Sequence, residues 1–317
     1  MRAYVSVIGG MNLDLKGIPF QSLLSGTSNP GKVYSVAGGV GRNIAHNLAL
    51  LEVPVYLFGA VGDDLFGAHI LRETQQAGVD TTYVRVVPQQ QTGLYLSILD
   101  DFHDLAVAVS DMDISNFVDH AYLQSHQDII SNSSFIVAET NLTIDTLAYI
   151  LDLSNHARIP CLLEPVSVEK ANKLRNLEKG IDYITPNRTE VEALCQREIL
   201  SPSQLEAACA QLSRKYRHIL VTLGEDGVYS YCRNKQTGNF YPACKTQVVD
   251  VTGAGDAFVA GVVCGLFRNF DLEESISLGM AVANLTLQAA ETVSSDLTFE
   301  LCLSLATKPR SHEKERR

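Results

Sequence analysis

The sequence predicts an α/β fold: a three-layer α/β/α sandwich with a mostly parallel central sheet and a small β-sheet lid. Strand-like and helix-like runs alternate along most of the 317 residues, which is the pattern of a parallel sheet covered by helices on both faces. Three strand-like runs between residues 82 and 110 follow one another with no helix between them. Such a cluster is typical of a local antiparallel sheet, which here becomes the lid candidate.

The first half of the chain opens with a short buried strand over residues 4–10 and an irregular segment over 12–34. A helix is expected over 41–52, because Ile44, Leu48 and Leu51 fall on one face of it. A strand over 53–62 and a helix over 65–78, which ends at a glycine, come next. The side sheet is expected from residues 82–87, 92–99 and 105–110.

The second half alternates more regularly. Strands are expected over residues 134–139, 159–165, 180–187, 217–224, 227–232 and 245–251. Helices are expected over residues 143–157, 188–195, 201–216, 257–267 and 272–289. Ser201 and Pro202 suit the cap and first position of their helix. No linker divides the chain, so one domain is expected over 1–307, followed by a charged tail, 308–317, that is expected to be disordered.

The composition excludes several classes of function. The net charge is −11, which argues against binding nucleic acid through a basic face. The sequence has no run of about 18 apolar residues, so no membrane span is expected. No signal peptide is evident. The seven cysteines contain no C-x-x-C pair, so reduced thiols, no zinc site and a cytoplasmic location are expected.

The stretch "DVTGAGDAF", Asp250 to Phe258, places small residues and then an acid at the start of a helix. Amides at a helix N-terminus carry partial positive charge and suit a phosphate or another anion. Asp256 in the first turn would then serve as a base that takes a proton from a hydroxyl group. An acid at this position is also favoured by the helix dipole alone, and the stretch by itself leaves both interpretations open.

A second glycine cluster, "AGGVGRN" at residues 37–43, also precedes a helix. It matches neither the dinucleotide fingerprint G-x-G-x-x-G nor the P-loop G-x-x-x-x-G-K-[ST], so neither of those sites is supported. Taken alone, this cluster is equally well explained as a tight turn.

Five segments, taken in order from near residue 9 to near residue 290, resemble the ribokinase-like sugar and nucleoside kinases of the PfkB family. These segments are "GGVGRNIAHNLALL", "GAVGDDLFG", "PNRTEVE", "VTLGEDGV" and "DVTGAGDAF". The resemblance implies a ribokinase-like fold and transfer of the γ-phosphoryl group of ATP to a hydroxyl group. Asp256 would be the catalytic base, and the amides of Gly253, Ala254 and Gly255 would form the anion hole.

The resemblance also implies the remaining site residues. Asn187 and Glu190 match the element that orders Mg²⁺ through water. Residues that would border ATP are Asn187, Thr222, Gly224, Gly227 and Asn284. Asp250 and Thr252 match a monovalent-cation site, for K⁺, that residues 289–296 would complete. Residues that would hold the sugar are Asn12, Asp14, Gly38, Gly39, Asn43 and Glu139.

The lid is expected from segments near 12–36 and 82–112. The segments "SNPGKVYSVAGGVGRNIAHNLALL", "VSDMDISN" and "LLEPVS" together resemble those of family members acting on the C-nucleoside pseudouridine. Asp111 is the candidate acceptor for the extra N–H of that base, although a solvated turn acid explains it as well. Glu139 and Glu164 stand where some members carry the shorter Asp. Pairing of two lids would give a homodimer.

Two other functions remain open. A kinase for another acceptor, either another nucleoside or a free sugar such as ribose, fructose or ketodeoxygluconate, would share all the phosphoryl-transfer motifs. A free-sugar kinase would lack a base-sized pocket under the lid. A catalytically silent nucleoside sensor would have lost the base or the anion hole, whereas Asp256 and the whole glycine turn are present. A dinucleotide-dependent oxidoreductase is disfavoured by the missing fingerprint.

Overall fold

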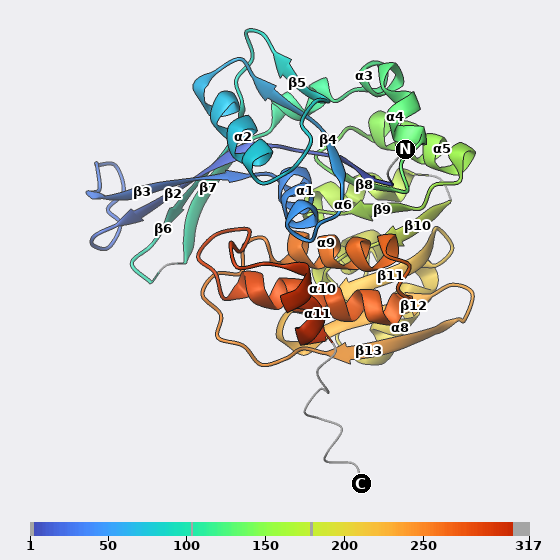
Figure 1. Ribbon diagram of the computed structural model, residues 1–317. Helices are drawn as coiled ribbons and strands as arrows, with labels where there is room; N and C mark the ends of the chain where they lie inside the picture. The colour runs from blue at the N-terminus through green and yellow to red at the C-terminus, as the bar shows by residue number, and fades with distance from the viewer. Residues whose placement is uncertain (1–2, 103, 178–179, 307–317) are drawn as a thin grey trace.

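The computed structural model describes residues 3–102, 104–177 and 180–306. Within them the chain forms a nine-stranded central sheet and a separate four-stranded sheet, hereafter the side sheet (Figure 1). The expected charged tail, 308–317, lies outside the described residues. No helix in the described part of the chain combines the length and apolar character needed to cross a bilayer.

The central sheet is parallel over most of its width. Its spatial order is β13 (Thr237–Pro242), β12 (Gly227–Cys232), β11 (Tyr216–Thr222), β10 (Ile181–Ile184), β9 (Cys161–Glu164), β8 (Phe135–Glu139), β1 (Val5–Ile8), β4 (Val55–Gly62) and β5 (Val84–Val87). All neighbours from β11 to β5 run parallel, and β12 and β13 add an antiparallel edge.

Helices cover both faces of this sheet because successive strand residues point to opposite sides. In β8, Phe135 and Val137 join one buried cluster, whereas Ile136 and Ala138 join the other. Helices on the first face are α1 (Val40–Leu50), α2 (Leu65–Gln76), α9 (Ala254–Phe267), α10 (Leu272–Leu287) and α11 (Phe299–Ala306). Helices on the second face are α3 (His120–Ser125), α4 (Gln127–Ser131), α5 (Ile144–Ala157), α6 (Val168–Ala171), α7 (Arg188–Cys195) and α8 (Pro202–Leu212). The predicted three-layer sandwich is confirmed.

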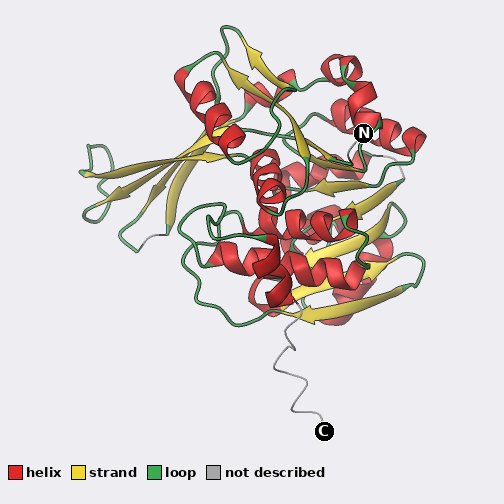
Figure 2. Ribbon diagram, in the orientation of Figure 1, coloured by secondary structure: helices red, strands yellow, loops and turns green. Residues whose placement is uncertain are grey.

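The side sheet projects from the body of the molecule, where Figure 2 shows it as a group of long strands apart from the helices. Its order is β3 (Gly31–Gly38), β2 (Asn12–Pro19), β6 (Gly93–Leu99) and β7 (Leu105–Asp111). The prediction of an irregular segment over 12–34 is wrong, because β2 and β3 are two paired strands. Most of β3 is exposed, so the alternation of buried and polar residues that reveals a strand is weak there.

Two further expectations are corrected. Residues 82–87 do not join the side sheet, because β5 pairs in parallel with β4 at the edge of the central sheet. The strand expected over 245–251 is a loop in which Val248, Val249 and Val251 are exposed, and the last strand, β13, lies earlier. The helix caps were predicted correctly: Ser201 caps α8, and Pro202 occupies its first position.

Candidate active site

The candidate site lies where the parallel strands of the central sheet end. Glu139, Glu164 and Thr222 are the last residues of β8, β9 and β11. Gly10 follows β1, and Asn187 follows β10. Because these strands are parallel, their carboxyl ends meet at one edge of the sheet, which is where open α/β sheets bind ligands.

Asp256 sits in the first turn of α9 and faces the start of α1. The side-chain amide of Asn43 donates to its carboxylate Oδ2 over 2.9 Å. Burial raises the pKa of Asp256 from 3.8 to about 7, with the negative charges of Glu139 and Asp14 adding to the rise and the Asn43 bond opposing it. A carboxyl group with this pKa can take up and release a proton near neutral pH, as a general base must.

The glycine turn before Asp256 leads into the N-terminus of α9, where the anion hole is predicted. Gly253 has a φ of 82°, and a Cβ there would lie 2.1 Å from the Thr292 carbonyl oxygen, so only glycine fits. No side chain caps this helix N-terminus. The Ala254 amide donates to the Val251 carbonyl oxygen over 3.3 Å. The space beside Gly255 is open, because a Cβ there would meet no protein atom within 4 Å. The open face of Gly255 therefore leaves room for a ligand.

A pocket of about 160 Å³ opens in front of this turn. Its lining consists of Val40, Glu164, Val166, Thr185, Asn187, Glu190, Thr222, Gly255, Asp256 and Phe258. Of these, Val40, Val166, Thr185 and Phe258 were not predicted as site residues, and Glu164 was noted only as a departure from some family members. Val166 carries a φ of 66°, a strained conformation for a β-branched residue of the kind that concentrates at functional sites.

Two buried glutamates supply oxygen atoms to the pocket. The Thr185 hydroxyl donates to Glu164, and burial together with the charge of Glu190 raises the pKa of Glu164 well above its usual range. Glu190 and Asn187 form a capping box at the start of α7, and burial raises the pKa of Glu190. No group of three His, Cys, Asp or Glu side chains suited to a metal occurs in the described ranges. The donors fit a hydrated Mg²⁺, which keeps most of its waters and needs few protein ligands.

The predicted sugar residues of β2, β3 and α1 come together beside Asp256. The Asn12 side-chain amide donates to Asp14 Oδ1 over 2.6 Å, and burial raises the pKa of Asp14 to about 6. A Cβ on Gly38 would lie 2.2 Å from Asp14 Oδ2, so this glycine makes space for the carboxylate. Gly39 has a φ of 100° and packs against the backbone of residue 10. The two glycines therefore let the chain pass close to a polar cluster.

Glu139 is only 1% exposed and is held by protein groups on both oxygens. Oε1 accepts from the Gly10 amide over 2.6 Å, and Oε2 accepts from the backbone and side chain of Asn141, each over 2.7 Å. Burial raises its pKa. Glu139 therefore braces the loop after β1, next to the sugar residues.

Several predicted residues lie apart from the pocket lining. Asp111 is exposed at the end of β7 and accepts from the Asp113 amide over 3.4 Å. Asn284 lies on α10, where Gln288 donates to its side chain over 2.7 Å. Gly224 and Gly227 form the turn around η3 (Gly224–Asp226), with φ values of 59° and 119°. Their positive φ values alone account for both glycines.

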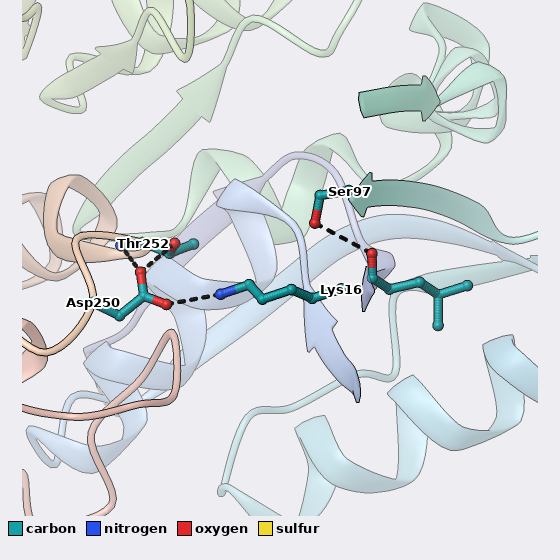
Figure 3. A network of polar contacts seen from close by, with 5 residues as sticks. Lys16, Ser97, Asp250 and Thr252 are labelled. Carbon is teal, nitrogen blue, oxygen red and sulfur yellow. Dashed lines mark hydrogen bonds and ion pairs between the residues drawn. The ribbon is translucent and has the colours of Figure 1, made fainter. Parts of the chain in front are cut away.

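Asp250 and Thr252 precede the glycine turn and form a local loop. Oδ1 of Asp250 accepts from the Thr252 amide over 2.8 Å and from its hydroxyl over 2.7 Å. Oδ2 accepts from Lys16 of β2 over 2.8 Å, a contact that the sequence did not reveal (Figure 3). Burial by itself would raise the pKa of Asp250, but these hydrogen bonds together lower it.

Solved structures share this architecture. The structure of Arabidopsis thaliana ribokinase complexed with ribose and ATP superposes with a TM-score of 0.87 at 23% identity, covering 98% of this chain and 100% of that one. At this level of identity the likeness shows the fold.

Sequence relatives extend over the same length. A pseudouridine kinase of Escherichia coli (strain K12) is 36% identical over 303 residues, which cover 95% of this chain and 96% of the relative. A ribokinase of Lactococcus lactis subsp. lactis (strain IL1403) is 29% identical, covering 90% of each chain. The family model for pfkB family carbohydrate kinases matches residues 2–298. The chain is therefore a member of the pfkB family of carbohydrate kinases.

Proposed function

We propose that the protein phosphorylates the 5′-hydroxyl group of pseudouridine with ATP, giving pseudouridine 5′-phosphate and ADP. The observation that carries this proposal is the 36% identity to a pseudouridine kinase along 95% of the chain. The pocket supports phosphoryl transfer, because a carboxyl group with a pKa of about 7 stands beside an open helix N-terminus.

Asp256 acts as the base in this mechanism. It accepts the proton of the 5′-hydroxyl group as the oxygen attacks the γ-phosphorus, and the bond from that phosphorus to the bridging oxygen of ADP breaks on the opposite side. Asn43 orients the carboxylate through its 2.9 Å hydrogen bond. The sugar hydroxyl groups are held by the Asn12–Asp14 pair, which offers both donors and acceptors.

The start of α9 stabilises the charge on the transferred group. Its uncapped N-terminus and the open face of Gly255 direct partial positive charge toward an anion. Thr222 lines the pocket, and the glycines of the η3 turn, which lie outside that lining, would border the nucleotide beside it. Mg²⁺, when bound, would neutralise phosphate charge, and Asn187, Glu190 and Glu164 of the pocket lining would hold its water shell.

The side sheet serves as the lid over the nucleoside. Its strand β2 carries Asn12 and Asp14, and Asp111 at the end of β7 is the group proposed to accept the extra N–H of the base. Val33, Leu96, Val107 and Val109 leave much apolar surface exposed on this sheet. A second copy of the chain is the partner proposed to cover it, which gives a homodimer. The seven free cysteines suit the reducing cytoplasm.

A free sugar is the alternative substrate, because a ribokinase is 29% identical over 90% of the chain. The test is ADP formation with pseudouridine, uridine, adenosine, ribose and fructose, run beside Asp256→Asn. Turnover of pseudouridine above the others supports the proposal. Preferred turnover of ribose or fructose would replace it with a sugar kinase, and no turnover of any acceptor would favour a silent sensor.

A further inference from the structure

Lys16 of β2 joins the side sheet to the loop before the glycine turn. Its ammonium group lies 2.8 Å from Asp250 Oδ2, although the two residues are 234 positions apart in sequence. The backbone around Lys16 is fixed, because β2 pairs with β3 on one side and with β6 on the other. The Ser97 hydroxyl of β6 adds a bond to the Leu15 carbonyl oxygen over 3.3 Å (Figure 3).

Asp250 holds the loop that leads into the anion site. Its Oδ1 binds both the amide and the hydroxyl group of Thr252, and the next residue, Gly253, is the N-cap of α9. The Asp250 carboxylate thus helps to hold this turn through its two hydrogen bonds to Thr252. Only 23% of the Asp250 side chain is exposed, so its negative charge needs a partner close by.

The residues present do not fit a monovalent-cation site at Asp250. Both carboxylate oxygens already accept hydrogen bonds from protein groups, and the one turned away from Thr252 is bound by a positive charge. An ammonium group and K⁺ carry the same charge, and both bind carboxylate oxygens. The Lys16 ammonium group therefore binds Asp250 Oδ2 in the place that an external cation would occupy.

We propose that the Lys16 ammonium group replaces an exogenous monovalent cation, so that this kinase orders its anion site without K⁺. Lys16 is a positioning residue, which acts on the transferred phosphoryl group through Asp250 and the turn at Gly253. The inference rests on the proposed kinase activity but not on the identity of the acceptor.

The test compares wild type, Lys16→Met and Lys16→Arg in potassium chloride and in choline chloride at equal ionic strength. Rates are measured with the best acceptor, and Tm is measured without any substrate. Wild type and Lys16→Arg should work equally in both salts. Lys16→Met should lose about tenfold in rate in choline, the scale of one lost charge-assisted hydrogen bond, and K⁺ should restore the rate and raise its Tm.

The double variant Lys16→Met/Asp250→Asn is the matched control, because it lacks the carboxylate that would bind K⁺ and should not respond to the salt. Activation of wild type by K⁺ as strong as that of Lys16→Met would overturn the proposal. A loss in Lys16→Met that K⁺ does not repair would also overturn it. If no acceptor is turned over, the kinase activity itself fails, and the Tm response of Lys16→Met to K⁺ still decides the role of Lys16.

Discussion

Asn43 Nδ2 donates to Asp256 Oδ2 over 2.9 Å, and this bond joins the first turns of α1 and α9. The two helices follow the two glycine clusters that stand out in the sequence. Their N-termini therefore meet at one point, with the sugar residues on the α1 side and the anion turn on the α9 side. In the proposed mechanism, this contact places Asp256 between the acceptor and the phosphoryl donor.

Replacing the base should abolish transfer without unfolding the protein. Asp256→Asn keeps the size and the hydrogen bond to Asn43 but removes the proton acceptor, so kcat should fall by about 10²–10⁴-fold while KM for ATP changes little. Steady-state kinetics and a circular dichroism spectrum check this. Retention of more than about a tenth of the wild-type kcat would show that another group takes the proton.

The activity should depend on the ionisation of Asp256. Since its pKa is about 7, kcat/KM for the acceptor should rise with pH and level off above that value. Asn43→Ala removes the hydrogen bond that lowers this pKa, so its profile should shift to higher pH. The ionisation of ATP affects the profiles of wild type and Asn43→Ala equally, so it cannot cause a shift between them. An unshifted profile in Asn43→Ala would assign the inflection to a different group.

The same ionisation should appear in the stability of the free protein. The folded-state pKa of Asp256, about 7, lies above its ordinary value of 3.8, so its contribution to stability is present below the lower value and lost as pH rises through the higher one. Asp256→Asn escapes that loss. Its Tm should match wild type near pH 4 and exceed it by about 6 °C near pH 8. An equal Tm difference at both pH values would contradict the raised pKa.

Replacing two glycines of the site by alanine should change different kinetic constants. A Cβ on Gly38 would lie 2.2 Å from Asp14 Oδ2, so Gly38→Ala should displace that carboxylate and raise KM for the acceptor. A Cβ on Gly255 would meet no protein atom within 4 Å. Gly255→Ala should therefore keep its Tm within about 2 °C of wild type and lose kcat, because the methyl group enters the space left for the anion. Unchanged kcat in Gly255→Ala would remove this glycine from the anion site.

The sequence revealed the parts of the site that depend on local chemistry. Asp256 and Gly253 were predictable because glycines, an acid and an apolar helix stand next to one another. The pairing of Lys16 with Asp250 was not, since it depends on the placement of the side sheet against a distant loop. Val166 was missed because a strained β-branched residue carries no sequence signal.

In the fold, too, local patterns were predicted and the pairing of distant segments was not. The central sheet follows from buried strands that alternate with amphipathic helices. The side-sheet strands β2 and β3 were missed because most residues of β3 are exposed. The segment therefore lacks the alternation of buried and exposed residues that predicts a strand. The apolar run near Val249 was read as a strand, yet it forms an exposed loop. Hydrophobic pattern therefore identifies the buried strands of the central sheet, but it does not distinguish an exposed strand such as β7 from an exposed loop such as residues 245–251.

The most direct test of the central claim is kcat/KM for pseudouridine and for ribose, measured side by side in wild type and in Asp256→Asn. Wild type should prefer pseudouridine by at least about tenfold, a difference of about 1.4 kcal/mol, and the variant should lose activity on both. A preference for ribose, or an Asp256→Asn variant that still phosphorylates pseudouridine at the wild-type rate, would contradict it.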